Sequence, residues 1–329
     1  GKYLPPVRCC PAGAACAHQC SRGATFADVN GDGAVDLLVS STGGPNALLL
    51  NDGRGRFTDA TEAAGLKLRA GSQGLTLTDM DGDGDLDLYL ANYGENSMLR
   101  SGGMFSVRTV GGKPVVTGRH ANRLKIIQNR LIELGEPDVL YRNDGKGFFT
   151  PASWTDGSIF LDHQGKAFKA IPWDQGLSAM FRDINQDGYP DLYVCNDFQT
   201  PDRIWLNDGQ EHFRPLAAEA LRSTPHFSMS VDFADIDRDG LDDFFVTDML
   251  SRSHVLRMRQ IGATNPPPDE VGEDLDRHQI RRNTLFLNRG DGTYAEIANF
   301  AGVDATDWTW CVIFLDVDLD GYEDILVTT

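Results

Sequence analysis

The apolar residues of this chain fall into short runs, and five of these runs follow the same acidic pattern. The pattern reads D-x-[DN]-x-D-G-x-x-D and occupies residues 28–36, 79–87, 183–191, 235–243 and 316–324, which we call loops 1 to 5. Three uninterrupted apolar residues follow each loop, at 37–39, 88–90, 192–194, 244–246 and 325–327. A strand with one face in water alternates apolar and polar residues, so these runs predict strands that are covered on both faces.

A second motif, an Asn-x-Gly turn followed by an aromatic residue, comes after four of the five loops. These turns begin at Asn51, Asn143, Asn207 and Asn288. Asn and Gly between apolar stretches are a strong hairpin signal. Each unit then reads as strand, acidic loop, strand, connector, strand, turn and strand. The basic unit of about 52 residues is close to the blade length of known propeller repeats.

We therefore expect an all-β fold, a β-propeller of four-stranded antiparallel blades, with four complete blades and one partial blade in this chain. The expected divisions are a Cys-rich segment 1–23 and blade units 24–66, 67–177, 178–224, 225–303 and 304–329. The extra residues lie mainly in the connector between strands two and three, as insertions 97–138 and 249–283. Insertions at one position of a repeat map to one face of the domain. Within the first insertion, residues 126–132 favour a small hairpin over a short helix.

The acidic loops predict bound calcium. Calcium takes six to eight oxygen ligands in flexible geometry, and Gly at position 6 of each loop allows the sharp turn that brings the acids together. We expect ligands from the side chains at positions 1, 3, 5 and 9 and from the backbone carbonyl at position 7. These are Asp28, Asn30, Asp32, Ala34, Asp36, Asp79, Asp81, Asp83, Asp85, Asp87, Asp183, Asn185, Asp187, Tyr189, Asp191, Asp235, Asp237, Asp239, Leu241, Asp243, Asp316, Asp318, Asp320, Tyr322 and Asp324.

The alternative is that these segments are ordinary Asp/Gly turns, which are common. Charge crowding argues against it, because each loop places three or four carboxylates close together and a divalent ion removes their repulsion. Up to five ions are expected, with weaker sites where Asn30 and Asn185 replace Asp. The formal net charge of −18 excludes a general electrostatic nucleic-acid partner.

Four of the six cysteines crowd the N-terminus at Cys9, Cys10, Cys16 and Cys20. Their spacing lacks the paired C-x-x-C of a zinc ribbon, so disulfides in an oxidising compartment are favoured over a metal site, with connectivity open. Cys195 and Cys311 stand alone in apolar runs and are expected to be buried thiols.

The loops, the Asn-Asp-Gly-x-Gly-x-Phe hairpins and the tails at 64–66 and 301–303 resemble the FG-GAP/VCBS repeat family. That family includes integrin α-subunit propellers. The segments at 135–141 and 307–310 resemble more closely the bacterial ASPIC/UnbV-type members, which are similar to cartilage acidic protein. The resemblance covers residues 24–329. It implies about seven blades, calcium in the blade loops, export, and a role in adhesion or assembly.

The expected function is that of an exported calcium-binding propeller acting as a binding, adhesion or assembly-scaffold module. Calcium would be structural, and recognition would belong to the opposite rim, where the first insertion carries seven Lys/Arg against three acids. An acidic glycan or a protein is the expected partner, contacted by Arg119, Arg123 and Lys125. The alternative is a solvated loop with local ion pairs. Residues 266–268, three prolines, predict a rigid spacer, and Trp308 and Trp310 are expected to pack.

No H-E-x-x-H or G-x-S-x-G motif is present, so we do not expect an enzyme. The rival hypothesis is an exported carbohydrate-active enzyme, since abundant Asp pairs are compatible with glycosidase chemistry. No apolar stretch is long enough for a membrane helix. The expected location is extracellular, at the cell surface or periplasmic.

Overall fold

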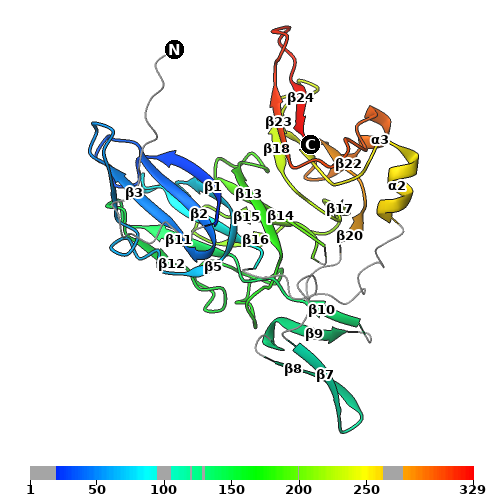
Figure 1. Cartoon of the computed structure of the whole chain (residues 1–329). Coiled ribbons are helices and arrows are strands. Elements are labelled where there is room, and N and C mark those ends of the chain that lie inside the picture. The colour runs from blue at the N-terminus through cyan, green and yellow to red at the C-terminus, as the bar shows by residue number, and fades with distance from the viewer. Residues whose placement is uncertain (1–19, 95–104, 119–120, 128–129, 199, 262–276) are drawn as a thin grey trace, which may run out of the picture.

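The computed structural model describes residues 20–94, 105–118, 121–127, 130–198, 200–261 and 277–329. Nearly all of its regular structure is β-strand, arranged in consecutive small sheets (Figure 1). Strands pair with their chain neighbours in four four-stranded meanders, and a fifth sheet has two strands. The expected propeller architecture of four complete blades and one partial blade is thereby confirmed.

The strands of blades 1 and 2 share one sheet, because β2 also pairs with β5. Their bounds are β1 (Cys20–Ala27), β2 (Asp36–Pro45), β3 (Ala47–Asn51), β4 (Phe57–Asp59), β5 (Arg69–Thr78), β6 (Asp87–Asn92), β11 (Val139–Asn143) and β12 (Phe149–Pro151). Blade 3 contains β13 (Gly176–Arg182), β14 (Asp191–Asn196), β15 (Arg203–Asn207) and β16 (Phe213–Pro215). Blade 4 contains β18 (Val231–Ala234), β19 (Asp243–Val246), β21 (Thr284–Asn288) and β22 (Tyr294–Glu296), and blade 5 contains β23 (Cys311–Leu315) and β24 (Asp324–Thr328).

The second strand of each blade follows an acidic loop, and its burial explains the apolar runs. Every residue of β6, β14 and β19 is buried, as expected for a strand covered on both faces. In contrast, β24 alternates between exposed and half-buried residues. It belongs to the last sheet, and in the described part of the chain no further sheet packs on it.

A hydrogen bond repeated between blades joins the tail of one blade to the outer strand of the next. The Phe149 N–H donates to the carbonyl of Ala64 at 2.9 Å, and the Tyr294 N–H donates to that of Ala220 at 3.0 Å. Gly65 makes the first contact possible. Its φ is +81°, and a Cβ there would lie 2.6 Å from the Phe149 carbonyl oxygen. A side chain at this position would therefore push blades 1 and 2 apart.

An aromatic wedge fills the space between blades 2 and 3. The connector that follows β12 supplies Trp154 and Phe160, whose rings stack with centroids 3.8 Å apart. Phe160 also meets the fully buried Trp205 of β15 edge-on at 5.2 Å. Aromatic pairs of this kind add to the stabilisation from burial alone, so the extra residues of this connector are part of the core.

The remaining elements lie in the connectors, either between the second and third strands of a blade or, for the helix at 298–301 and the strand at 223–225, between one blade and the next. The first insertion contains two hairpins, which stand apart from the blades in Figure 1, and the second contains a helix. The bounds are β7 (Phe105–Val110), β8 (Lys113–Gly118), η2 (Ala121–Arg123), β9 (Leu124–Ile127), β10 (Arg130–Glu133), β17 (Ser223–Pro225), α2 (His254–Ile261), β20 (His278–Ile280) and α3 (Ala298–Ala301). The antiparallel β9–β10 pair confirms the hairpin expected at 126–132. Helix α2 was not expected.

The two cysteines outside the N-terminal segment, Cys195 and Cys311, differ in their exposure to solvent. Cys195 is buried, as expected, but Cys311 is exposed, so that prediction is wrong. The reason is that Cys311 lies on the face of β23 that also carries the exposed Ile313 and Leu315, and no sheet of the described residues covers this face. The side chains of the four N-terminal cysteines and residues 266–268 lie outside the described residues.

At the end of each blade away from the acidic loop, one side chain binds the backbone in the later part of the second strand or just after it. This residue directly precedes the third strand and is Asn46, Asp138, Asp202 or Asn283. Its oxygen accepts a backbone N–H, for example that of Asn196, the last residue of β14, which donates to Asp202 at 2.8 Å. Where the residue is Asp, a buried tyrosine hydroxyl of the second strand also donates to it, at 2.8 Å in both blades.

Burial raises the pKa of Asp202 to about 7, although Asn196, Ser228 and Tyr193 donate to it and Arg277 lies nearby. Its unfolded pKa is near the ordinary value of about 3.9, so between about pH 4 and 7 the folded state binds more protons than the unfolded state. The contribution of Asp202 to stability should therefore decrease as pH rises through this window. Urea unfolding from pH 4.5 to 7.5 with EGTA present should show a shallower loss of stability in Asp202→Asn than in the parent chain. A parallel pH profile in the two proteins would contradict this.

Candidate metal centres

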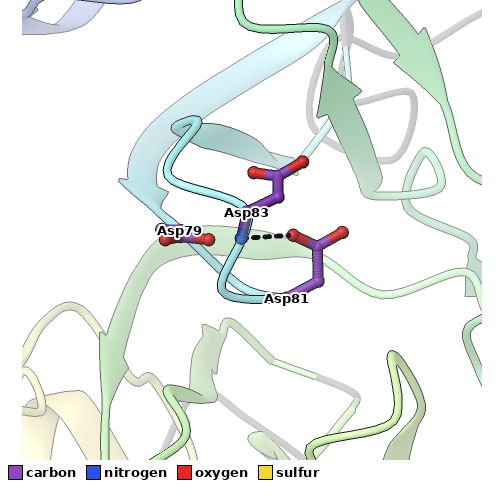
Figure 2. A group of neighbouring side chains, drawn as sticks. All are labelled: Asp79, Asp81 and Asp83. Atoms are coloured by element: carbon purple, nitrogen blue, oxygen red, sulfur yellow. Dashed lines mark hydrogen bonds between the residues drawn. The ribbon is translucent and has the colours of Figure 1, made fainter.

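Loop 2 shows the geometry of the acidic segments most clearly. The chain curls so that Asp79, Asp81 and Asp83, at positions 1, 3 and 5, gather around one point (Figure 2). One oxygen from each side chain lies within 4.8 Å of the others. Three carboxylates that converge from a single short loop match the oxygen-rich ligand set that calcium prefers.

The curl depends on two residues with left-handed backbone in every loop. Position 6 is always Gly, with φ between +84° and +92°. Position 4 is also left-handed, and it is Gly in loops 1 and 2 but Gln186, Arg238 and Leu319 in loops 3 to 5. A side chain costs about 1 kcal/mol or more in this backbone region. The sequence pattern identified the turn at position 6 but not the one at position 4.

Backbone N–H groups hold the acidic side chains toward the centre of each loop. In loop 1 the carboxylate of Asp28 accepts N–H bonds from Gly31 at 2.9 Å, Asp32 at 3.2 Å and Gly33 at 2.8 Å. The position 5 carboxylate accepts from the position 7 N–H in all five loops, at 2.8 to 3.0 Å. These bonds orient the carboxylates before any ion binds. Of the three N–H bonds to Asp28, its Oδ2 atom accepts only the one from Gly33 and keeps a further lone pair for a cation.

The five loops fall into two classes. Loops 2, 4 and 5 each bring three carboxylates together, from Asp79, Asp81 and Asp83, from Asp235, Asp237 and Asp239, and from Asp316, Asp318 and Asp320. In loops 1 and 3 the position 3 amide donates to the position 5 carboxylate, Asn30 to Asp32 at 3.1 Å and Asn185 to Asp187 at 2.9 Å. The amide N–H thereby stabilises the negative charge of the position 5 carboxylate, as a bound cation would. This fits the weaker calcium sites expected in loops 1 and 3.

Position 9 ties the loop to the hairpin of the same blade. In loop 3 one oxygen of Asp191 accepts the Ile184 N–H at 2.9 Å, and the other accepts the Asn207 N–H at 2.7 Å. The equivalent pairs of bonds form in loops 1, 2 and 4. These carboxylates do not join the convergent groups at positions 1, 3 and 5. Their role as ligands, and that of the position 7 carbonyls, stays a prediction.

The electrostatics of the loops favour a bound cation. Burial, followed by the neighbouring Asp83, raises the pKa of Asp81 above its usual range. Burial raises the pKa of Asp87 and Asp191 to about 7 and that of Asp243 to about 6, and nearby loop carboxylates add to the shift. A divalent ion would relieve this repulsion and would find its oxygen ligands already placed. The residues present therefore fit calcium.

The loops also contact the next blade. The side-chain amide of Asn143 in blade 2 donates to the carbonyl of Val29 in loop 1, and that of Asn207 in blade 3 donates to Met80 in loop 2, both at 2.8 Å. Each of these carbonyls belongs to position 2, beside the first acid of the loop. A cation in a loop would therefore stiffen the contact between two blades as well as the loop itself.

The basic residues proposed for a partner surface are placed differently from one another. Arg123 is mostly buried and forms ion pairs with Glu133 at 3.9 Å and Glu136 at 3.1 Å. These ion pairs hold its side chain within the insertion, and its role in binding a partner stays a prediction. The ammonium of Lys125 lies 5.8 Å from the centre of the Trp173 ring and remains exposed. Arg119 lies outside the described residues.

The tryptophans near the last loop are less buried than expected. Trp308 is 49% exposed and Trp310 is 57% exposed, so packing accounts for only part of their surface.

Two residues of functional interest were missed by the sequence analysis. Arg142 stands where the other hairpins have Leu, and Glu211 stands where they have Gly. Both side chains lie beside Asp81 of loop 2. Each of the two residues departs from the repeat at its position, and this departure is the signal by which the sequence could have identified them.

Comparison with known families agrees with this geometry. A model of the FG-GAP-like repeat matches residues 28–106, 183–246 and 275–327, which include all five loops. The chain belongs to the FG-GAP-like repeat family. Cartilage acidic protein 1 of Mus musculus is 23% identical to this FG-GAP chain over 268 residues. The match covers 70% of this chain and 40% of the mouse protein, so the chain spans less than half the length of that relative.

Solved structures resemble the FG-GAP chain only loosely. A lectin of Agrocybe aegerita, described as recognising non-reducing terminal N-acetylglucosamine, has a TM-score of 0.38 and 16% identity, over 94% of this chain and 75% of the lectin. Rhamnogalacturonan lyase YesW has a TM-score of 0.38 and 14% identity, over 94% of this chain and 55% of the lyase. These scores are too low to support a functional argument. Within the described residues, no helix has the length and apolar character needed to cross a membrane.

Proposed function

We propose that this chain is an exported calcium-binding propeller that acts as a binding, adhesion or assembly-scaffold module and not as an enzyme. The observation that carries the proposal is the convergence of three carboxylates at positions 1, 3 and 5 of loops 2, 4 and 5. The same backbone scaffold repeats in loops 1 and 3, with Asn at position 3. Calcium has a structural role in this proposal, because each loop joins two strands of one blade and loops 1, 2 and 3 also bond to the next blade.

The buried acids outside the loops support a structural role over catalysis. Asp138 accepts the Tyr89 hydroxyl and the Asn92 N–H, and Asp174 pairs with Arg203. These side chains are buried and bonded within the protein. A glycosidase would instead need two carboxyl groups that face a bound sugar.

Recognition is proposed for the rim opposite the acidic loops. Loop 2 lies at the start of β6 and the first insertion follows its end, so the loop and the insertion leave the blade on opposite sides. In the β7–β8 hairpin most residues are exposed, including Arg108, Val110, Lys113 and Val115. A basic hairpin on an acidic chain suits an anionic partner such as an acidic glycan.

Removing the charge of this hairpin should weaken binding to an anionic surface without affecting folding. We expect the Arg108→Ser/Lys113→Ser variant to elute from a heparin column at lower salt than the parent chain. The variant makes fewer charge contacts with the heparin, so less salt is needed to screen them. Arg54→Ser/Arg56→Ser is the matched control, since it removes two exposed charges from a turn on the loop rim. Equal elution of the two variants would contradict recognition by the opposite rim. Melting curves in calcium should coincide for all three proteins.

A further inference from the structure

Two hairpin positions that are otherwise constant in this chain carry charged residues at the contact between blades 2 and 3. The residue before the turn Asn is Leu50, Leu206 or Leu287 in three blades and Arg142 in blade 2. The fifth residue of the turn, counted from that Asn, is Gly55, Gly147 or Gly292 in three blades and Glu211 in blade 3. The two exceptions are opposite in charge and belong to neighbouring blades.

The structure brings both exceptions to loop 2. The Nη2 atom of Arg142 lies 3.4 Å from the Oδ2 atom of Asp81 and 2.5 Å from the Oε2 atom of Glu211. Asp81 is the more enclosed acid, with its side chain 13% exposed against 53% for Glu211. The guanidinium therefore bridges a position 3 acid of the metal loop and an acid of the next blade.

Glu211 occupies a backbone conformation that favours glycine. Its φ is +71°, and the glycines at the same position in the other turns have φ between +78° and +79°. A glutamate there costs about 1 kcal/mol or more relative to the conformation it prefers. Its ion pair with Arg142 offsets this cost, which suggests that the side chain is present for the contact it makes.

We propose that Arg142 is a resident counter-cation of loop 2 that competes with calcium for Asp81, and that Glu211 is the alternative acceptor that releases it. The inference rests on the proposed calcium occupancy of the loops and adds regulation of one of them. Among the described residues, the position 3 acids of loops 4 and 5 form no ion pair with Lys or Arg, so loop 2 alone carries this device.

The competition follows from the placement of charges. The other oxygen of Asp81 accepts the Asp83 N–H at 3.3 Å, so Oδ2 is the oxygen with more room for a cation, and Arg142 lies on it. A guanidinium stays charged at every physiological pH and would repel a divalent ion a few ångströms away. Calcium therefore binds more easily when Arg142 shifts toward Glu211. By linkage, calcium in loop 2 should strengthen the Arg142–Glu211 contact between blades 2 and 3.

Loop-resolved hydrogen exchange across a calcium titration tests the proposal. Peptides that contain residues 79–87 and 235–243 report loops 2 and 4 separately, because the N–H groups of Gly84 and Gly240 bond to the first acid of each loop. In Arg142→Leu we expect the calcium midpoint of loop 2 to fall about tenfold, because a unit positive charge about 5 Å from a divalent ion repels it by about 1.4 kcal/mol or more even in water, the equivalent of tenfold in affinity. The midpoint of loop 4 should not change. Lys146→Leu, in an exposed part of the same turn, removes the same charge and should leave both midpoints in place.

The Glu211→Gly variant gives the opposite expectation. Without its second acceptor Arg142 stays on Asp81, so the loop 2 midpoint should rise several-fold. In the Arg142→Leu background the same substitution should raise the midpoint less than in the parent chain, because only the direct attraction of the Glu211 charge is then lost. Leu and Gly are the residues that the other hairpins of this chain have at these two positions, so both substitutions should be tolerated. Arg142→Gln serves as a second variant without the charge, because it keeps most of the apolar part of the arginine side chain.

The possible results separate the inference from the proposed function. If loops 4 and 2 respond to calcium but the loop 2 midpoint is unchanged or higher in both Arg142 variants, the counter-cation role is overturned and the calcium loops stand. If no loop of the parent chain responds to calcium, both ideas are defeated. The inference is supported if the Arg142 variants lower the calcium midpoint of loop 2 alone and Glu211→Gly raises it.

Discussion

Removing calcium with EGTA is expected to lower the melting temperature of the protein by roughly 12 °C. A ligand present at 100 times its dissociation constant adds about 2.7 kcal/mol per site, so the three loops with three convergent carboxylates add about 8 kcal/mol. In a chain of this size each kcal/mol moves the melting temperature by about 1.5 °C. Differential scanning calorimetry in calcium and in EGTA measures the difference.

Two comparisons make the calcium experiment specific. Magnesium should restore less of the lost stability than calcium, because it requires near-octahedral geometry and keeps its waters. The double variant Asp237→Asn/Asp318→Asn gives loops 4 and 5 the pattern of loops 1 and 3, and its calcium-dependent shift should be smaller. Melting curves that coincide in calcium and EGTA would show that the loops are stable without an ion.

Replacing Asn207 with alanine should destabilise the protein by about 3 kcal/mol. Its side chain is 1% exposed, and its amide donates to the carbonyls of Met80 in loop 2 and Pro190 in loop 3. The oxygen of the same amide accepts the Gly209 N–H. Each buried hydrogen bond contributes about 1 kcal/mol, and the unpaired carbonyl of Met80 adds a further cost. Urea unfolding with saturating calcium measures the effect.

Asn51→Ala is the matched control for this substitution. Asn51 holds the equivalent turn of blade 1 and bonds to Val35 of its own loop, but its side chain is only half-buried, and in the described structure it makes no hydrogen bond to a preceding blade. We expect a loss of about 1 kcal/mol. Equal losses in the two variants would mean that the bond between blades contributes nothing beyond the turn itself.

The sequence predicted the repeated blade well, because each part of it has a local chemical signature. The apolar runs after loops 2, 3 and 4 became fully buried second strands, and the Asn-x-Gly turns became the hairpins between the third and fourth strands. The convergence of acids at positions 1, 3 and 5 also followed from the spacing, since glycine at position 6 forces the curl.

Features that depend on neighbouring blades could not be predicted in this way. The exposure of Cys311 and the bond from Asn207 to Met80 are set by residues far apart in the sequence. The charged pair of Arg142 and Glu211 was visible only as a departure from the repeat. Helix α2 lies in an insertion, where no other copy of the repeat exists for comparison.

The most direct test of the account is a count of bound ions by native mass spectrometry after dialysis against calcium. The account predicts at least three calcium ions per chain, held by loops 2, 4 and 5, and up to five at higher calcium concentration. Replacing Asp79, Asp235 and Asp316 with alanine should remove the tightly bound ions. A protein that is folded and carries no calcium under these conditions would contradict the central claim.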